Sequence, residues 1–456
     1  MRLRHRQYEI DMLNGAVMPK LLSFALPLVL SSVLQLTFNA ADVIVVGRFE
    51  GEAALAAVGA PGALINLLVN LFMGLSVGAN VVVAQYRGAG DYRQTSAAVH
   101  TSVALSLIGG VGVGAFGFLL AGLFLSLMNT PADVLPLATA YMRIYFLGMP
   151  ANMIYNFGAA ILRAVGDTRR PLMYLTVSGV TNVILNLLFV IAFRMGVSGV
   201  ALATIISQII SAALVVLCLI RSDGAIRLDV KRIRLEADKV RRIAKVGLPA
   251  GLQGMLFSIS NVLIQSTVNS FGTVATAGNT VASNIEGYIY VSMNAIYQTA
   301  ITFTGQNVGA RRFDRVSRVA RSSLMAVTGI GLALGGLLLL FMRQLFGIYT
   351  GDDAVIAAAT VRSAVIAPTY FLCGLMDTAV GLLRGMGSSV LPMAVSLLGV
   401  CGFRMVWILG IYPFQPTRTM LYLSYPISWA ITFAAHMACY FRVKRRLTSY
   451  ATKETA

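Results

Sequence analysis

Two stretches of the chain, LRAVGDTRRP (162–171) and LRGMGSSVLP (383–392), share their Leu-Arg start, a central Gly and the final Pro. They lie 221 residues apart. A second pair keeps the same separation, because AQYRGAGDY (84–92) returns as GQNVGARRF (305–313), again with a Gln and a Gly in register.

A third pair lies near the start of each copy. Pro27, in FALPLVL, returns 222 residues later as Pro249, in VGLPAGL. Three matches in register indicate an internal duplication. Because a proline inside a helix removes a backbone hydrogen bond, we also predict that Pro27 bends its helix.

The composition predicts that both copies lie in a membrane. Of the 456 residues, 57% are hydrophobic and 12% are charged, whereas soluble domains carry about 25% charged residues. Twelve apolar runs, each bounded by charge, Gly or Pro, are long enough to be transmembrane helices. The predicted spans are 18–46, 53–84, 96–122, 133–162, 171–193, 196–220, 247–271, 274–304, 317–342, 354–383, 390–411 and 419–441.

The predicted fold is therefore an all-α polytopic membrane protein with two parallel six-helix repeats. We expect an N-terminal lobe at 1–220, a basic linker at 221–246, a C-terminal lobe at 247–441 and a tail at 442–456. Because each repeat has an even number of helices, both enter the membrane from the same side, related by a pseudo-two-fold axis along its normal. Such an architecture predicts a central substrate cavity and is typical of transporters.

The basic residues predict the orientation. The net charge is +18, and 29 of the 36 Lys and Arg residues lie on segments that share one side of the membrane, against four on the other. Positive charge favours the cytoplasmic side, so we expect both termini in the cytoplasm and the protein in the inner (plasma) membrane. The basic residues form short clusters between apolar runs, without a basic stripe interleaved with aromatics, which argues against nucleic-acid binding.

The motifs of several enzyme classes are missing. The sequence has no GxxxxGK[ST] motif, so ATP is not expected to be the direct energy source. It also has no HExxH, no GxGD and no Ser/His arrangement at membrane depth, which disfavours an intramembrane enzyme. We therefore predict that the protein is not an enzyme and carries no cofactor.

Three carboxylates fall inside predicted membrane spans: Asp42, Glu286 and Asp377. A carboxylate in hydrocarbon costs a few kcal/mol or more, so it normally faces a wet cavity or a partner. A functional interpretation is open for all three. The alternative is a structural ion pair with one of the intramembrane arginines, Arg143, Arg362 or Arg404.

Depth favours a functional role for Asp42. It lies about 7 Å below the outer boundary of its helix, with Asn182 and Asn186 in the outer half of another span and Thr204 roughly 12 Å deep in the next. One carboxylate, two amides and a hydroxyl at similar depth suit Na⁺, and a lone buried carboxylate suits H⁺. The alternative is that Asn and Thr only join helices by hydrogen bonds.

Further polar residues are candidates for lining the substrate cavity. Asn156 is one of them, and it is the repeat equivalent of Asp377. The full set is Gln35, Asn39, Asn66, Asn70 and Asn156.

The layout and several stretches resemble the multidrug and toxic compound extrusion (MATE) family of cation-coupled efflux transporters. The resemblance covers essentially the whole chain, and it is the order and spacing of the stretches that make it strong. They are NAADVIVVG (39–47), LRAVGDTRRPLM (162–173), TNVILNLLFV (181–190), VALATIIS (200–207), VGARR (308–312) and CGLMDTAVGLLRGMGSS (373–389).

The resemblance implies a V-shaped pair of six-helix lobes that exports organic cations in exchange for Na⁺ or H⁺ by alternating access. It places the N-lobe cation site on Asp42, Asn182, Asn186 and Thr204. It places a C-lobe carboxylate on Asp377.

This chain departs from the family at two positions. Phe257 stands where many relatives have a glutamate, which puts their C-lobe cation site in doubt here and leaves the role of Glu286 open. Asn186 stands where some relatives have Asp.

The function we predict is secondary active efflux of amphipathic organic cations. The expected partners are these small molecules and membrane lipid, and we expect a monomer. The alternative within the same superfamily is a flippase for lipid-linked precursors, and an ion channel is a more distant one. A flippase that carries diphosphate headgroups is expected to line its cavity with several arginines, whereas here the three candidates sit toward the outer ends of their helices.

Overall fold

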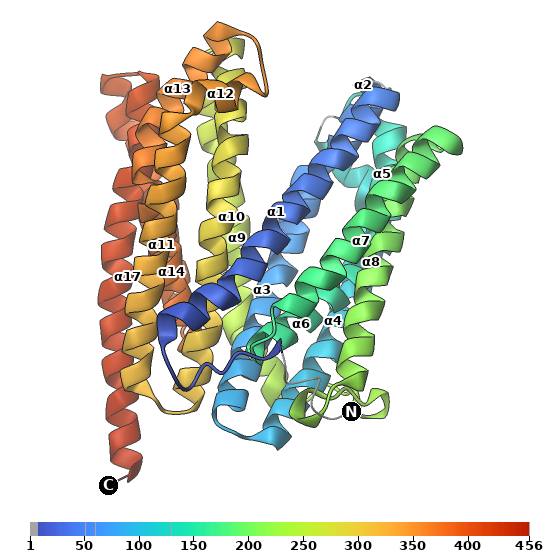
Figure 1. The fold of residues 1–456 in the computed structure, drawn as a ribbon. Helices are drawn as coiled ribbons and strands as arrows, with labels where there is room; N and C mark the ends of the chain where they lie inside the picture. The colour runs from blue at the N-terminus through green and yellow to red at the C-terminus, as the bar shows by residue number, and fades with distance from the viewer. Residues whose placement is uncertain (1–7, 51, 60, 129, 456) are drawn as a thin grey trace. The chain divides into compact units, whose positions relative to one another are not determined.

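The computed structural model describes residues 8–50, 52–59, 61–128 and 130–455. All regular secondary structure in these ranges is helical (Figure 1). The side chain of Asn66, one of the predicted cavity residues, lies outside the described part.

The helices pack into two compact units. Unit 1 contains the residues up to Ile10 together with Leu30–Gly251, and unit 2 contains Asp11–Val29 together with Leu252–Ala456. Each unit holds six of the predicted spans, with two exceptions: the first predicted span begins in unit 2, and the seventh begins in unit 1.

The helices of the first half follow the predicted spans. They are α1 (Val17–Phe49), α2 (Glu52–Gly59), α3 (Gly62–Gly88), α4 (Tyr92–Leu127), α5 (Leu135–Leu147), α6 (Met149–Ala164), α7 (Arg169–Leu187) with the π-helical turn η2 (Leu188–Ala192), and α8 (Gly196–Arg221). Within unit 1, α4 packs against α5 and α6, and α7 packs along α8 (Figure 1).

The second half repeats this pattern. Its helices are α9 (Ala237–Asn269), α10 (Thr273–Gly309), α11 (Phe313–Leu340), α12 (Met342–Gly347), α13 (Asp353–Ile366), η5 (Ala367–Thr369), α14 (Tyr370–Gly385), α15 (Val390–Ser396), η6 (Leu397–Gly402), α16 (Phe403–Val406), η7 (Trp407–Ile411), η8 (Tyr412–Phe414) and α17 (Arg418–Thr455). Within unit 2, α10 packs against α11, α13 and α14.

In three of the predicted spans the helix is divided at or directly beside a proline. Pro61 separates α2 from α3, Pro150 lies in the first turn of α6 directly after α5, and Pro368 falls in η5 between α13 and α14. A proline donates no backbone hydrogen bond and clashes with the preceding turn, so each helix ends and restarts there.

Two helices extend further into the polar segments than predicted. α9 begins at Ala237 rather than at 247, and α17 continues to Thr455 rather than ending near 441. Both extensions are rich in helix-forming residues and contain no Gly or Pro, and Asp238 lies in the first turn of α9, where a negative charge favours the helix dipole. The linker between α8 and α9 is correspondingly shorter than 221–246 and contains two short 3-10 turns, η3 (Gly224–Ile226) and η4 (Val230–Arg232).

Nine helical segments of the described residues are long and apolar enough to cross a membrane by themselves. The predicted spans outside this set correspond to the interrupted pair α5–α6 and to α10 and α17. Buried polar residues explain the low hydropathy of α10, since Asn279, Glu286 and Gln306 are enclosed within unit 2.

The division between the units cuts α1 and α9 at equivalent points. The boundary in α1 lies between Val29 and Leu30, and the boundary in α9 directly after Gly251. Each boundary is two residues beyond the proline inside the helix, Pro27 or Pro249. The first part of each of these helices therefore belongs to the unit built mainly from the other repeat.

Glycines allow the first part of α9 to cross α3 closely within unit 1. A Cβ at Gly74 would lie 2.1 Å from the backbone nitrogen of Gly251, and a Cβ at Gly78 would lie 2.3 Å from the carbonyl oxygen of Ile243. Gly247 and Gly251 meet the α3 backbone in the same way. Two small-xxx-small pairs therefore let the two backbones touch, which is a common arrangement for packed membrane helices.

We expect Gly74→Ile to remove most of the folded protein from the membrane. The added side chain meets backbone rather than a movable side chain, so the destabilisation should reach at least about 3 kcal/mol. The matched control is Gly112→Ile on α4, where a Cβ meets nothing within 4 Å. The measurement is the thermal unfolding of both variants in detergent, and equal midpoints would show that this crossing does not need glycine.

Candidate functional site

Asp42 lies on α1 and meets two amides of α7. The Asn186 side chain donates a hydrogen bond to the Asp42 carboxylate, and its nitrogen lies 3.3 Å from the side-chain oxygen of Asn182. Asn182 and Asn186 are only 5% and 1% exposed. The side-chain oxygen of Asn186 is buried and accepts no hydrogen bond from any described residue. This Asp42 cluster (Asp42, Asn182 and Asn186) therefore offers a carboxylate and a buried amide oxygen with free lone pairs.

A glycine lets α1 approach α7 closely at this place. A Cβ at Gly179 of α7 would lie 1.8 Å from the Phe38 ring of α1. Phe38 precedes Asp42 by four residues, and Gly179 precedes Asn182 by three, so both contacts lie on the same faces of the two helices. The Phe38–Gly179 contact therefore brings the carboxylate within reach of the amides.

The backbone of α7 changes directly after the Asp42 cluster. Asn186 is followed by η2, a single π-helical turn. Such turns are rare and occur frequently at functional sites, because the wider turn shifts the register of the helix. No pattern in the sequence predicted this turn.

Thr204, the fourth residue of the predicted cation site, lies on α8, which packs along α7. Its hydroxyl donates a hydrogen bond to the Val200 carbonyl, 3.0 Å away, within its own helix. The hydroxyl oxygen keeps its lone pairs as an acceptor, and no hydrogen bond among the described residues joins Thr204 to the Asp42 cluster.

Tyr141 of α5 is a neighbour of the cluster that the sequence reasoning missed. It interacts electrostatically with the Asp42 carboxylate. Its ring stacks on Tyr145, with the centroids 6.3 Å apart and the planes at 28°. Two tyrosines four residues apart share one face of a helix, and this spacing is the signal that could have pointed to them.

Asp377 of α14 lies in a second polar group, within unit 2. Tyr290 of α10 is a polar neighbour of its carboxylate, and Arg384, two helical turns further along α14, attracts it electrostatically. Asp377 forms no ion pair within 4 Å among the described residues, and it is half-buried. Asn156, its repeat equivalent in unit 1, donates instead to the Asn152 carbonyl of its own helix.

Glu286 forms an ion pair with Arg362 in the interior of unit 2. Two guanidinium nitrogens lie 3.0 and 2.8 Å from one carboxylate oxygen, and the Ser363 hydroxyl donates to the other oxygen at 3.0 Å. Arg362 also donates to Asn279, at 2.7 Å. Of the two interpretations left open for Glu286, the structure therefore shows the structural ion pair.

We expect Glu286→Gln to destabilise the protein rather than to impair coupling. The change leaves the Arg362 charge buried without a counter-ion, which costs about 3 to 5 kcal/mol. The check is the melting temperature and the amount of protein in the membrane. The double variant Glu286→Leu with Arg362→Met should recover much of the loss, and a stable but uncoupled single variant would instead assign Glu286 to the transport mechanism.

The other two intramembrane arginines have no carboxylate within ion-pair distance among the described residues. Arg143 lies 5.6 Å from the centre of the Phe118 ring. Arg404 lies 4.1 Å from the centre of the Tyr425 ring and donates to the Ser428 hydroxyl. Arg404 is buried and Arg143 is exposed, and a cation–π contact is worth more for the desolvated guanidinium of Arg404.

The remaining predicted residues lie in different surroundings. Gln35 and Asn39 are exposed on α1, on the face that carries Asp42, and Asn70 is half-buried on α3. Phe257 packs against the apolar core of unit 2. The position where many relatives carry a glutamate is therefore an apolar packing position in this chain.

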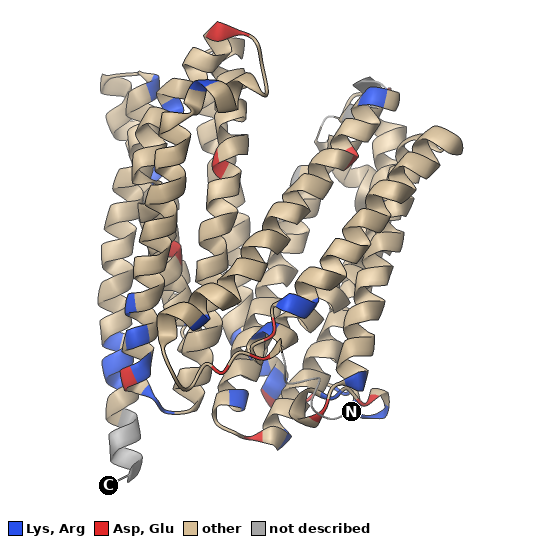
Figure 2. Ribbon diagram, viewed as in Figure 1, with Lys and Arg blue, Asp and Glu red and all other residues tan. Residues whose placement is uncertain are grey.

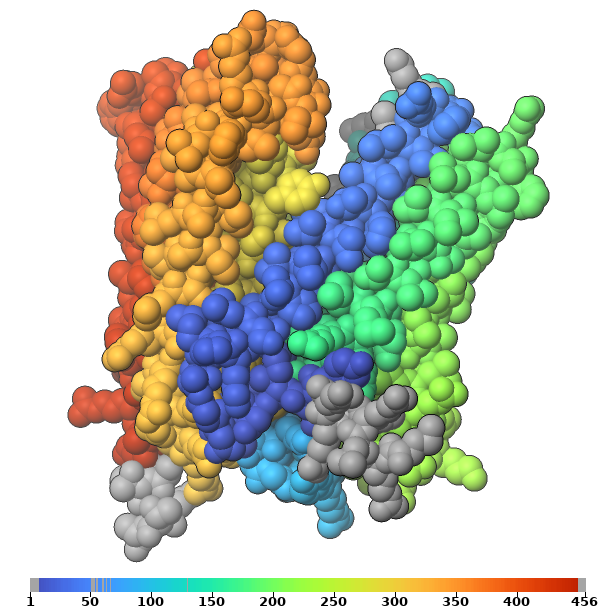
Figure 3. All heavy atoms as spheres, viewed as in Figure 1, coloured from blue at the N-terminus to red at the C-terminus, as the bar shows by residue number. Residues whose placement is uncertain are grey.

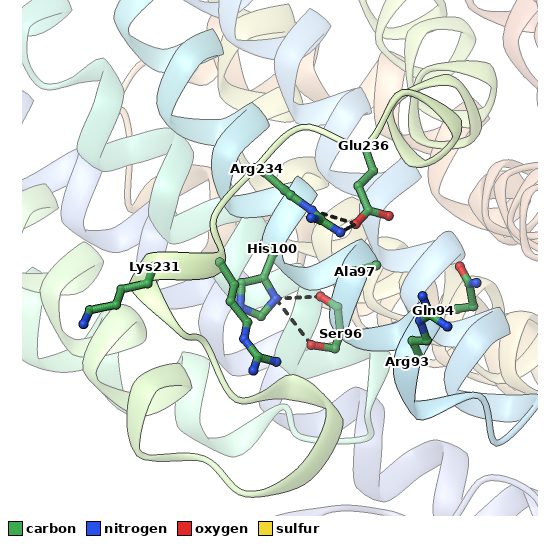
Figure 4. A pocket seen from close by; sticks show the side chains of 9 residues that line it. Arg93, Gln94, Ser96, Ala97, His100, Lys231, Arg234 and Glu236 are labelled. Carbon is green, nitrogen blue, oxygen red and sulfur yellow. Dashed lines mark hydrogen bonds and ion pairs between the residues drawn. The ribbon is translucent and has the colours of Figure 1, made fainter.

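A separate cavity of about 600 Å³ lies at the basic end of unit 1 (Figure 4). His100 of α4 forms part of its wall; one ring nitrogen lies 2.7 Å from the Ser96 carbonyl oxygen, and the other accepts from the Asp229 backbone N–H at 3.0 Å. Arg234 pairs with Glu236 at its edge. These contacts fasten the α8–α9 connection to α4, and no residue of the Asp42 cluster lies in this wall.

The comparisons with known proteins agree with the duplicated fold. The family model MatE matches residues 27–188 and again 249–408, once in each repeat. The probable multidrug resistance proteins YpnP and YoeA of Bacillus subtilis (strain 168) are similar to this chain. YpnP is 29% identical over 89% of both chains, and YoeA is 26% identical over 90% of both.

A solved structure shows the same fold. An outward-facing multidrug resistance MATE family transporter of the MOP superfamily superposes with a TM-score of 0.87, at 20% identity, over 97% of this chain and 99% of that chain. The predicted fold class, twelve transmembrane helices in two six-helix repeats, is confirmed. With the family model matched in both repeats, the chain belongs to the MatE family of multi-pass membrane transporters.

Proposed function

We propose that this protein is a secondary active multidrug efflux transporter that exports amphipathic organic cations in exchange for Na⁺ or H⁺. The names of the relatives support the class of substrate. The observation that carries the proposal is the Asp42 cluster, in which the carboxylate accepts from the Asn186 amide while the buried oxygen of that amide has no hydrogen-bond partner among the described residues. These are the hard oxygen ligands that a small cation prefers, and the carboxylate alone is sufficient for a proton.

Ion binding can drive export only if the ion has different affinities for the two states of the transporter. An ion bound at Asp42 shifts the equilibrium between outward- and inward-facing states only if it binds one state more tightly than the other. The cluster joins α1 to α7, so a relative movement of these two helices changes the distances between the oxygens that hold the ion. Residues Asn182 and Thr204 complete the proposed ligand set.

The other carboxylate of the mechanism is Asp377. We place it in the path of the substrate or of a second ion, because it is half-buried and free of an ion pair among the described residues. Its neighbour Tyr290, which is 39% exposed, is an accessible aromatic side chain. A carboxylate beside an accessible aromatic ring suits an amphipathic cation.

We propose further that the protein lies in the inner (plasma) membrane as a monomer, with both termini in the cytoplasm, and needs no cofactor and no nucleic acid. Figure 2 supports the orientation, because Lys and Arg gather in unit 1 at the α3–α4 end and in unit 2 at the α10–α11 end. The basic side of a membrane protein is normally cytoplasmic.

Reporter fusions test this orientation. We expect fusions after residues 128, 195 and 348 to report the outer side, because these connections lie opposite the basic ends. Fusions after residues 90, 232 and 312 should report the cytoplasm. A cytoplasmic signal after residue 195 would contradict the six-plus-six arrangement.

The test of the function is transport of a fluorescent organic cation into everted membrane vesicles. We expect accumulation when a Na⁺ or an H⁺ gradient is imposed without ATP, and none when both gradients are collapsed. If no organic cation moves under either gradient while a lipid-linked diphosphate crosses the membrane, the flippase alternative replaces the proposal.

A further inference from the structure

The cavity of about 600 Å³ at the basic end of unit 1 is lined by two segments that lie far apart in the sequence. The first turns of α4 form one wall, and the connection between α8 and α9 forms the other. Its cations are Arg93 on α4 and Lys231, Arg232 and Arg234 on the connection. We call this cavity the basic pocket. Its volume lies within the range of about 300 to 1,000 Å³ that is usual for ligand sites.

Two of the four cations are paired within the connection itself. The Arg232 guanidinium lies 3.3 Å from the Asp229 carboxylate, and the Arg234 guanidinium lies 2.7 Å from the Glu236 carboxylate. The side chains of the two arginines are 77% and 74% exposed. Because exposed ion pairs are weak, both guanidinium groups remain available to a ligand that carries more negative charge.

Arg93 and Lys231 are the unpaired cations of the basic pocket. Neither side chain forms an ion pair within 4 Å or a hydrogen bond to any residue that the structure describes. They lie on opposite sides of His100 in the close view (Figure 4). Both are exposed, so each side chain can turn toward a ligand. The pocket therefore has more positive than negative charge, which favours an anion.

Hydrogen bonds hold the two walls of the pocket together. The Nε2 atom of His100, which is 4% exposed, accepts from the Asp229 backbone N–H at 3.0 Å. The Thr101 hydroxyl accepts from the Glu236 backbone N–H at 3.4 Å. The connection is thus tied to α4 both before and after its three basic residues. A site that is formed before the ligand arrives loses less conformational entropy on binding.

The basic pocket lies at the edge of the membrane-spanning part of α4. The predicted span of this helix begins at residue 96, so Arg93 lies outside it and His100 inside. These two residues are separated by about 10 Å along the helix axis, whereas the headgroup layer is about 5 to 7 Å thick on each side of a bilayer. The light blue atoms around the turn between α3 and α4 lie at the surface (Figure 3). The pocket is therefore at the depth of lipid headgroups.

Exposed apolar side chains adjoin the basic residues of the connection. Val230 is 63% exposed and Leu235 is 47% exposed, and they stand on either side of the basic stretch in the sequence. A segment that combines basic and exposed apolar side chains is typical of the membrane interface. A soluble anion would use only the cations, whereas a lipid uses both kinds of side chain.

We propose that the basic pocket binds the headgroup of an anionic phospholipid. Arg93 and Lys231 bind the phosphate from the two walls, and the acyl chains continue into the hydrocarbon. Hydrogen bonds from Arg and Lys to phosphate are charge-assisted and strong, and basic pockets of membrane proteins bind such headgroups. Because the phosphate joins α4 to the connection, the lipid is a structural ligand of unit 1. This role goes beyond the proposed transport and does not depend on it.

The test measures lipid binding to the purified full-length protein in a neutral detergent. The probes are dioleoyl phosphatidylglycerol, which is anionic, and dioleoyl phosphatidylcholine, which has the same acyl chains and no net charge. A ligand that binds only the folded state raises the unfolding midpoint as its concentration rises. We expect phosphatidylglycerol to raise the midpoint and phosphatidylcholine to leave it unchanged. Native mass spectrometry counts the bound lipids.

The test variant is Arg93→Gln with Lys231→Gln, which removes the two unpaired cations and leaves no carboxylate without its partner. Its dissociation constant for phosphatidylglycerol should rise about 30-fold. The matched control is Arg227→Gln with Arg241→Gln. Both of these arginines are exposed in unit 1, outside the pocket wall, and form no ion pair among the described residues. The control changes the net charge equally and should bind the lipid as the wild type does.

Inorganic phosphate and glycerol phosphate distinguish a lipid from a soluble anion. Both carry the phosphate without acyl chains, so neither should raise the midpoint at concentrations at which phosphatidylglycerol saturates. A soluble phosphate that binds as tightly as the lipid would replace the lipid as the ligand and contradict the proposal.

The lipid site is also contradicted if the two phospholipids act alike, or if the test variant and the control weaken binding equally. The second result would show attraction to the whole basic surface instead of binding in the pocket. None of these measurements uses an organic cation or an ion gradient, so a failed lipid site leaves the proposed transport untouched. A bound lipid in a protein that moves no organic cation would support the site and contradict the proposed function.

Discussion

Asp42→Asn is expected to abolish gradient-driven efflux. The replacement is nearly isosteric and can still accept the hydrogen bond from Asn186, so the packing of α1 against α7 should survive. The amide carries no charge to offset the dehydration of a cation and does not titrate in the accessible range. The driving ion then has no preference between the two states of the transporter and cannot shift their equilibrium.

The expected loss is at least about 100-fold in the initial rate, the effect of about 2.7 kcal/mol. The control is Asp133→Asn, the same change at an exposed position between α4 and α5, which should transport at the wild-type rate. Both variants are compared in proteoliposomes under Na⁺ and H⁺ gradients in turn. Wild-type efflux by Asp42→Asn under either gradient would remove Asp42 from the coupling site.

Asp377→Asn is expected to lower efflux roughly tenfold, the effect of about 1.4 kcal/mol, while the protein stays in the membrane at near-normal levels. Tyr290 is a polar neighbour of the carboxylate, and the amide that replaces the carboxylate has nearly the same size and shape. The variant therefore removes a charge without breaking an ion pair of the described residues.

Glu286→Gln is the contrast for this experiment, because Glu286 is a carboxylate inside the helices of unit 2 that is paired with a buried arginine. Asp377→Asn should be stable but transport little, whereas Glu286→Gln should be unstable. If Asp377→Asn is lost from the membrane as well, Asp377 has a structural role and does not take part in transport.

The sequence predicted much of the fold because the signals are strong. The repeat of Pro27 as Pro249 and of 162–171 as 383–392 reveals the two copies, and long apolar runs reveal the spans. The helix ends were less well predicted. Polar but helix-forming residues after 237 and before 455 continue α9 and α17 beyond the apolar segments, where hydropathy no longer indicates a helix.

The candidate site could be predicted in part. Depth along three helices grouped Asp42 with Asn182 and Asn186, and the structure joins them by hydrogen bonds. The partner of Glu286 could not be chosen from three arginines, because the pairing with Arg362 depends on how α10 packs against α13.

The central claim is that ion binding at Asp42 and export of the organic cation are linked through one equilibrium. The most direct test is the affinity of the purified protein for a fluorescent organic cation, measured over a range of Na⁺ concentration and of pH. Linkage requires reciprocity: if an ion changes the affinity of the protein for the substrate by some factor, the substrate changes the affinity for that ion by the same factor.

We predict that the wild-type dissociation constant changes by roughly 5- to 150-fold with one of the two ions, and that in Asp42→Asn it is the same at every Na⁺ concentration and pH. A wild-type affinity that is independent of both ions, or a full ion dependence retained by Asp42→Asn, would contradict the account.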